Sequence, residues 1–174
     1  MTVSKTLAEG KFLRMVCRGS WEMVQRVGVS GIVGMIAVTD DGKLVLVEQY
    51  RPPVDATVVE IPAGLAGDSE ASPDEPLAEA ARRELLEETG YRAGRVEPVA
   101  VGAPSAGLSD EMTTLFLCTG LARVGPGGGD DSEQIEVIEV PLADVEAYCR
   151  RRVEQGAVVD LNVYAALPFA RAGR

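Results

Sequence analysis

The order of apolar and polar residues predicts a domain that mixes strands and helices. Short apolar or alternating runs bounded by turn-forming residues predict strands at 21–27, 32–39, 43–50, 95–101, 113–119 and 134–140. Apolar residues at helical spacing predict helices at 76–89, 142–155 and 161–170. Asp40, Asp41 and Gly42 are typical of a hairpin turn, and the glycine-rich run 124–131 is typical of a mobile loop. Strands around a central helix, followed by further helices, favour an α/β sandwich.

The helix expected at 76–89 carries three carboxylates on one face. Glu84, Glu87 and Glu88 stand at positions i, i+3 and i+4, so their side chains are neighbours. Like charges at this spacing cost roughly a few tenths of a kcal/mol in an isolated helix, which suggests a compensating ligand. Mg²⁺ or Mn²⁺ is the simplest such ligand, because hard cations prefer carboxylate oxygens. The alternative is an amphipathic surface helix whose glutamates are only solvated.

The overall composition is typical of a soluble enzyme and not of a nucleic-acid binder. The chain has 174 residues with 46% apolar and 25% charged content, enough for one domain with a substantial core. Its formal net charge of −10 argues against a phosphate-backbone partner, so no nucleic acid is expected. An anionic small substrate would need metal ions and local arginines to offset this charge.

Histidine is absent from the sequence, which excludes several mechanisms. Ser-His-Asp hydrolysis, Cys-His catalysis and zinc sites built on imidazole all need it. Carboxylates must therefore do the acid–base work, and a carboxylate base together with Mg²⁺ is sufficient to hydrolyse a diphosphate. Cys17, Cys118 and Cys149 are widely spaced and are expected to be reduced. No apolar run reaches the length of a membrane span and no signal-peptide core is present, so we expect a cytoplasmic protein without a membrane partner.

A longer pattern surrounds the three carboxylates. Glu75 lies eight residues before Arg83, the acidic run follows, and Gly90 and Tyr91 close it. This arrangement resembles the signature of the Nudix hydrolases, G-x5-E-x7-R-E-U-x-E-E-x-G-U, in which U is apolar. Ten residues separate Gly64 from Glu75 in place of five, and we interpret the additional ones as a lengthened polar loop.

The resemblance implies the Nudix fold, an α/β/α sandwich with a mixed sheet. Here that fold would carry an N-terminal antiparallel strand extension. We expect residues 1–30 to form an N-terminal strand region for dimerisation and adenine contacts, and residues 31–174 to form the Nudix hydrolase domain. The two regions would make one structural domain overall.

The resemblance also implies a metal site. In this family the positions of Glu84 and Glu88 are the principal ligands of Mg²⁺, that of Glu87 is a further or bridging ligand, and the backbone carbonyl of Ala63 completes the shell. Arg83 would orient these carboxylates by ion pairing. Glu75 would pair with Arg83 or cap the start of the helix.

The catalytic base has two candidates. Family members use a glutamate on a loop beyond the signature, and both Glu111 and Glu133 occupy such positions. Either could equally be a solvated surface charge. We favour Glu111, because the glycine and serine before it supply a sharp loop that would aim a carboxylate inward.

The N-terminal half resembles the ADP-sugar pyrophosphatase branch of the family, whose best known substrate is ADP-ribose. The markers are Glu9–Phe12, Trp21 with Glu22 and Arg26, Glu48–Pro53, and Glu60–Leu65. The resemblance implies that Trp21 stacks on adenine, that Phe12 is supplied from the partner subunit of a homodimer, and that Arg26 and Arg51 hold phosphate or ribose groups. Glu22 and Glu60 belong to the same motifs and are counted as substrate-binding. The alternatives are a core position for Phe12, a half-buried strand position for Trp21 and surface ion pairs for the arginines.

These features together predict Mg²⁺-dependent hydrolysis of a nucleoside diphosphate sugar, ADP-ribose to AMP and ribose 5-phosphate. One departure concerns the substrate, because many ADP-ribose pyrophosphatases carry Ser-Pro-Gly where this chain has Ser105, Ala106 and Gly107. Hydrolysis of GDP-mannose or another nucleoside diphosphate sugar therefore stays open. A triphosphatase that cleans the nucleotide pool and a sensor that binds ADP-ribose without turnover are further alternatives.

Overall fold

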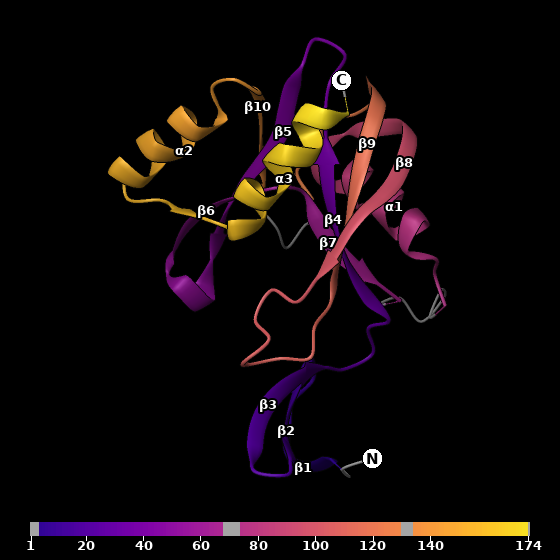
Figure 1. The fold of residues 1–174 in the computed structure, drawn as a ribbon, viewed down its shortest axis with the longest axis vertical. Coiled ribbons are helices and arrows are strands. Elements are labelled where there is room, and N and C mark those ends of the chain that lie inside the picture. The colour runs from indigo at the N-terminus through magenta and orange to yellow at the C-terminus, as the bar shows by residue number, and fades with distance from the viewer. Residues whose placement is uncertain (1–3, 68–73, 130–133, 174) are drawn as a thin grey trace.

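The computed structural model describes residues 4–67, 74–129 and 134–173, which form three β-sheets and three α-helices (Figure 1). The first sheet is an antiparallel extension that projects from the body of the molecule. It consists of β1 (Ser4–Glu9), β2 (Leu13–Arg18) and β3 (Trp21–Arg26). This is the N-terminal strand extension that the sequence analysis predicted.

The body contains two four-stranded sheets. One has the order β7 (Ala63–Ala66), β4 (Gly31–Ala37), β9 (Thr113–Arg123), β8 (Tyr91–Gly102), and the other β10 (Glu136–Pro141), β5 (Lys43–Arg51), β6 (Ala56–Glu60), β11 (Val158–Val159). The first is mixed, because β4 and β9 run parallel while its other neighbouring pairs run antiparallel. The short 3-10 helix η1 (Pro52–Val54) joins β5 to β6.

The helices lie in two layers. Helix α1 (Leu77–Thr89) covers one face of the mixed sheet, and α2 (Val145–Glu154) and α3 (Leu161–Ala172) lie on the other side (Figure 1). The buried apolar side chains form two hydrophobic clusters. Strand β4 contributes to both, because successive side chains of a strand point to opposite faces of the sheet. Met35 packs in the cluster with Leu85 of α1, whereas Ile36 packs in the cluster with Leu46 and Val163 of α3. The predicted α/β/α sandwich with a mixed sheet is confirmed.

The elements of the central region were predicted well, and several short strands were missed. Helix α1 begins after Pro76 and ends at Gly90, whose φ of 72° supplies the left-handed C-cap that glycine adopts without strain. Strands β6, β7 and β11 were not predicted, and β1 and β2 were expected only as part of the N-terminal strand region, without bounds of their own. Strand β1 is exposed along its whole length, so no apolar face marks it in the sequence. Among the described residues, no helix is long and apolar enough to cross a bilayer.

A buried ion pair ties α2 to the second sheet. The carboxylate of Glu48 is buried and accepts bonds from Arg152 Nε at 2.6 Å, Arg152 Nη2 at 2.5 Å and the Tyr148 hydroxyl at 2.6 Å. Burial alone would raise the pKa of Glu48, but these bonds outweigh it and hold the pKa below its usual value. The pair therefore stabilises the fold at neutral pH, and this contribution is lost as the pH falls through the lowered pKa.

We accordingly expect Glu48→Gln to lower the free energy of unfolding by about 2 kcal/mol at pH 7, since Arg152 loses its buried counter-charge. Urea denaturation at pH 7 and at acidic pH measures the difference, which should shrink at the acidic pH. Glu97→Gln, which removes a carboxylate from a largely exposed pair with Arg95 on β8, controls for the loss of one negative charge. Equal effects of the two substitutions would contradict the assignment.

Candidate active site

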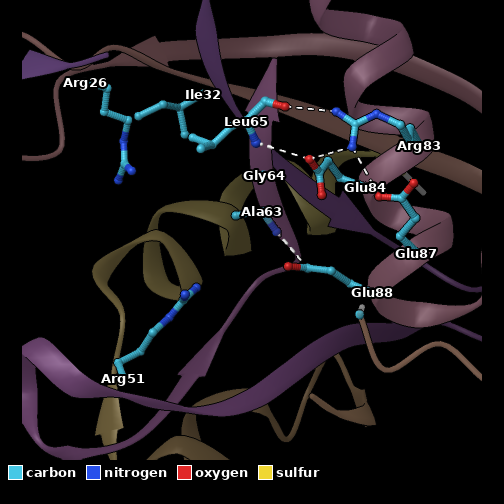
Figure 2. Close-up of a pocket in the computed structure, with 11 residues that line it drawn as sticks. Arg26, Ile32, Arg51, Ala63, Gly64, Leu65, Arg83, Glu84, Glu87 and Glu88 are labelled. Carbon is cyan, nitrogen blue, oxygen red and sulfur yellow. Dashed lines mark hydrogen bonds and ion pairs between the residues drawn. The ribbon is translucent and has the colours of Figure 1, made fainter. Parts of the chain in front are cut away.

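A cavity of about 580 Å³ opens between α1, β7 and the ends of β3 and β5 (Figure 2). It brings together both signs of charge from distant parts of the chain. Its lining consists of Arg26, Ile32, Arg51, Ala63, Gly64, Leu65, Arg83, Glu84, Glu87, Glu88 and Gly129. Three arginines and three glutamates thus face one space, which is suited to an anion on one side and a cation on the other.

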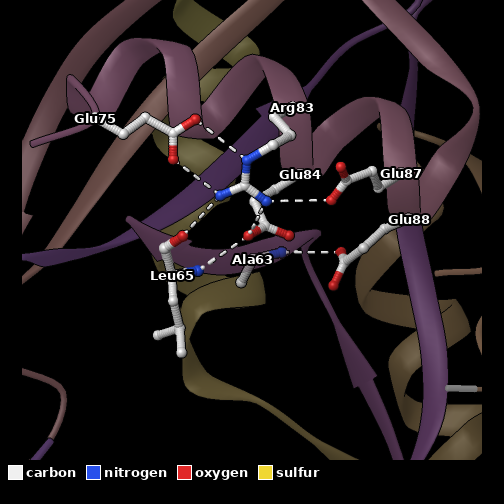
Figure 3. Close-up of polar contacts among 7 residues, drawn as sticks. All are labelled: Ala63, Leu65, Glu75, Arg83, Glu84, Glu87 and Glu88. Atoms are coloured by element: carbon white, nitrogen blue, oxygen red, sulfur yellow. Dashed lines mark hydrogen bonds and ion pairs between the residues drawn. The ribbon is translucent and has the colours of Figure 1, made fainter. Parts of the chain in front are cut away.

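Arg83 is the centre of a polar network on α1 (Figure 3). Its guanidinium forms a two-point ion pair with Glu75, with Nε–Oε1 at 3.2 Å and Nη2–Oε2 at 3.0 Å. Nη1 also donates to Glu84 at 2.9 Å and to Glu87 at 3.1 Å, while Nη2 donates to the carbonyl of Leu65 at 3.0 Å. Hydrogen bonding to Glu75 raises the pKa of Arg83 further above its ordinary value, so the group stays charged.

Glu84 lies against the backbone of β7. Its Oε1 accepts a bond from the N–H of Leu65 at 3.2 Å, and a Cβ at Gly64 would overlap its carboxyl group. Burial raises the pKa of Glu84, the charge of Arg83 offsets this only in part, and the charge of Glu87 raises it further. The absence of a side chain at Gly64 is therefore what allows this carboxylate to sit at the cavity wall.

Glu88 is only 4% exposed and lies one turn further along α1. Its Oε2 accepts a bond from the N–H of Ala63 at 3.1 Å, so two carboxylates one turn apart on the helix each accept a bond from a backbone N–H of β7 (Figure 3). In this conformation, no three His, Cys, Asp or Glu side chains within the described ranges converge closely enough to hold a metal ion.

The glycine-rich segment docks on the C-terminal end of α1. Gly128 N donates to Glu88 O at 2.8 Å and Gly129 N donates to Glu87 O at 3.1 Å, which satisfies carbonyls that a helix end leaves without partners. A Cβ at Gly127 would overlap the backbone of Thr89, so the approach requires glycine. A mobile loop was predicted at 124–131. Residues 124–129 do form a loop, bonded to the end of α1, while its mobility stays a prediction; residues 130–133 lie outside the described residues.

Two further arginines of the cavity are held by glutamates. Arg51 donates from Nε and Nη2 to Glu60, with the shortest distance at 2.8 Å, and Gln49 donates to the same carboxylate at 2.9 Å. Across the cavity, Arg26 Nε lies 2.6 Å from Glu111 Oε1. Each of the three arginines in the lining therefore has an acidic partner that orients it.

A second cavity of about 450 Å³ lies beside β3 and holds Trp21, Ala106 and Glu111. The indole of Trp21 is 59% exposed and donates to the carbonyl of Gly107 at 3.3 Å. Phe12 is 66% exposed, with Lys11 Nζ 4.8 Å from its ring centroid. Both aromatic rings are exposed, so the core position considered for Phe12 and the half-buried position considered for Trp21 are wrong.

The predicted site residues divide into groups. The second cavity is lined by Trp21 and Glu111, and Glu60 supports Arg51 from beside the first. The first cavity is lined by Arg26, Arg51, Ala63, Arg83, Glu84, Glu87 and Glu88. Phe12 and Glu22 line neither of these two cavities, and Glu133 lies outside the described residues. Ile32 and the glycine contacts were not predicted from the sequence, although a run of glycines also signals close backbone approach.

Comparisons with known proteins agree with this geometry. The model of the family described as NUDIX domain matches residues 30–161. An ADP-ribose pyrophosphatase of Bacillus subtilis (strain 168) is 37% identical over 80% of this chain and 71% of its own length. A methanol dehydrogenase activator of Bacillus methanolicus is 37% identical over 70% of this chain. The match covers 64% of that protein's length.

Two other similarities bear on function and fold. A GDP-mannose pyrophosphatase of Cronobacter sakazakii is 34% identical over 71% of this chain and 64% of its own length. The crystal structure of an ADP compounds hydrolase matches with a TM-score of 0.63 at 20% identity, covering 83% of this chain and 80% of that one, and supports the fold. The chain belongs to the Nudix family of hydrolases, as the pattern around Glu84 predicted.

Proposed function

We propose that this protein hydrolyses the diphosphate of a nucleoside diphosphate sugar in a Mg²⁺-dependent reaction, and that ADP-ribose is cleaved to AMP and ribose 5-phosphate. The observation that carries the proposal is the single cavity that Glu84, Glu87 and Glu88 share with Arg26 and Arg51. A diphosphate needs cationic groups to bind and a metal ion to react, and both kinds of ligand face this space. The ADP-ribose pyrophosphatase of B. subtilis supports the substrate assignment.

The donor set fits Mg²⁺. Glu84, Glu87, Glu88 and the carbonyl of Ala63 would hold the ion, which when bound would polarise phosphoryl oxygens and lower the pKa of a water. All the oxygen donors come from two adjacent elements, α1 and β7. The Glu84 and Glu88 side chains would have to turn from the N–H groups of Leu65 and Ala63 toward the cavity.

The remaining residues would bind and orient the substrate. Arg26 and Arg51 carry guanidinium groups, whose planar donors match phosphate oxygens. Arg83 would keep Glu84 and Glu87 in place through its bonds to both. Glu111 or Glu133 would take the proton of the attacking water, and in-line attack on one phosphorus would release the other phosphate as the leaving group.

The N-terminal sheet would supply the nucleobase site and a dimer contact. It carries exposed apolar side chains that a monomer leaves in water, among them Leu7, Leu13 and Met15. A homodimer would cover such a surface and would bring the partner's Phe12 toward the adenine. Sedimentation analysis tests this part of the proposal, because a monomer at assay concentration would exclude a shared site.

Trp21→Ala is expected to raise KM for ADP-ribose about 10-fold and to change kcat little. Base stacking on an exposed indole contributes roughly 1–3 kcal/mol to binding and acts equally in the ground and transition states. Steady-state kinetics measure both constants. Trp21→Phe, which keeps an aromatic face, should recover most of the affinity, and Tyr164→Ala on α3 provides a remote aromatic control. An unchanged KM for Trp21→Ala would remove Trp21 from the binding site.

GDP-mannose is the second candidate substrate. The C. sakazakii relative carries that activity in its name, and Ala106 in the second cavity departs from the pattern of many ADP-ribose pyrophosphatases. Both candidates share the chemistry at the diphosphate and differ in the base and the sugar. Nucleobase preference therefore separates them.

The test is chromatography of the products formed in Mg²⁺ from a panel of ADP-ribose, ADP-glucose, GDP-mannose, NADH and 8-oxo-dGTP. Preferred release of AMP from ADP-ribose supports the proposal. Preference for GDP-mannose or for the triphosphate would keep the metal chemistry and overturn the substrate. Binding of ADP-ribose without any product would favour a sensor.

A further inference from the structure

We propose that Glu111 is a positioning residue which holds the guanidinium of Arg26 at the rim of the cavity for the anionic part of the substrate, and that it is not the general base. The inference rests on the proposed function and assigns a role within it. It also reverses the preference for Glu111 over Glu133 as the proton acceptor that was based on the sequence.

The contact between the two side chains is short and partly shielded. Arg26 Nε lies 2.6 Å from Glu111 Oε1, and the side chains are 38% and 22% exposed. Nε is the guanidinium nitrogen closest to the alkyl stem, whereas the two terminal nitrogens lie further along the side chain. A carboxylate at Nε therefore sets the plane of the guanidinium, and the terminal nitrogens are the donors best placed for a phosphate.

The loop that carries Glu111 is fastened along β3. Trp21 donates to the carbonyl of Gly107, and Val24 N donates to the carbonyl of Leu108 at 2.9 Å. Gln25 then bonds Asp110, and Arg26 pairs with Glu111. The loop thus runs alongside β3 in the same order, and one backbone bond together with side-chain contacts places Glu111 beside Arg26.

Arg26 and Glu111 border one small cavity together, but of the two only Arg26 lines the cavity of the α1 carboxylates. Arg26 lines the cavity that holds Glu84 and Glu88, whereas Glu111 lines the second cavity and a smaller one that also borders Arg26. A general base must reach the proton of a water beside the reacting phosphorus. Glu111 is not among the residues that line the cavity of the α1 carboxylates, and its contact with Arg26 Nε lets it orient the arginine.

A base and a positioning residue leave different kinetic signatures. Loss of a base lowers kcat roughly 10²–10⁴-fold and removes the acid limb of the pH–rate profile. Loss of a residue that acts through Arg26 weakens ground-state and transition-state binding alike, so it raises KM and leaves kcat in place. Its effect should also vanish once Arg26 is gone, because coupled residues are not additive.

The experiment is a double-mutant cycle of Glu111→Gln and Arg26→Ala, with kcat, KM and pH–rate profiles measured for ADP-ribose in Mg²⁺. We expect Glu111→Gln to raise KM about 10-fold, with kcat within about threefold of wild type and an unshifted acid limb. In the Arg26→Ala background, Glu111→Gln should change KM less than about twofold. Asp110→Asn is the matched control, because it removes a carboxylate from the same loop that bonds Gln25 and no arginine of the cavity. Circular dichroism and Tm verify that each variant is folded.

Several results would overturn the inference. A collapse of kcat in Glu111→Gln, with loss of the acid limb, would make Glu111 the base. A lower KM would mean that Glu111 competes with the substrate for Arg26, and an equal rise of KM in Asp110→Asn would mean that only loop docking matters. Wild-type protein that releases no product would overturn the proposed function together with this inference, whereas wild-type turnover with a collapse of kcat in Glu111→Gln would overturn the inference alone.

Discussion

Glu88→Gln is expected to lower kcat by about 10³-fold or more and to leave the protein folded. The carboxylate of Glu88 is buried at the cavity wall, and removal of its charge would remove a principal ligand of an ion that contributes several kcal/mol to the transition state. The amide of glutamine still accepts the bond from Ala63 N, so α1 and β7 should stay joined. Steady-state kinetics and thermal unfolding measure the two effects.

Glu79→Gln is the matched control for this substitution. Glu79 lies on the same helix, its side chain is exposed, and it pairs with Arg82 away from the cavity. The same chemical change there should leave kcat within about twofold of wild type, since surface substitutions have small effects. Unaltered turnover in Glu88→Gln would remove the carboxylates of α1 from the metal site.

Gly64→Ala is expected to lower kcat roughly 10–100-fold with little change in Tm. A Cβ at position 64 would overlap the carboxyl group of Glu84, and the flexible side chain would move in response while the backbone stays in place. Displacement of a catalytic group by about 1 Å can cost 10²-fold in rate. The substitution therefore tests whether activity depends on the position of the Glu84 carboxylate, without lowering the stability of the fold.

Gly102→Ala at the end of β8 is the control for Gly64→Ala, because a Cβ there would meet no atom within 4 Å. It measures how much activity is lost when a methyl group is added to a strand at a position where the methyl group contacts nothing. Activity is measured across a range of Mg²⁺ concentrations, and we expect Gly64→Ala alone to need more Mg²⁺ for half-maximal rate. Equal kinetics in the two variants would mean that Glu84 does not act through its position against β7.

The sequence predicted the elements that have a local signal. Helix α1 has an apolar stripe that ends in Leu85, a proline at its start and a glycine at its end, and these features act within a few residues of one another. Strand β7 has only four residues, one of them Gly64, and gives no pattern of comparable length. Propensity cannot identify a strand whose stability comes from its pairing with β4.

The carboxylate positions and the partners of Arg83 could be predicted, whereas the partners of Arg26 and Arg51 could not. Glu84, Glu87 and Glu88 share a helix, so their common face follows from the helical repeat. The partner of Arg26 lies 85 positions further along the chain, and only the docking of that loop on β3 brings the two together. Glycine content alone likewise could not show that residues 125–129 hold the end of α1.

The most direct test of the account follows AMP release from ADP-ribose by protein stripped of metal with EDTA, before and after addition of excess Mg²⁺. We predict no release before the addition, and equal amounts of AMP and ribose 5-phosphate after it, with Glu88→Gln inactive in both conditions. Release that chelation does not affect, or Mg²⁺-dependent release that Glu88→Gln retains, would contradict the assignment of the α1 carboxylates to the metal.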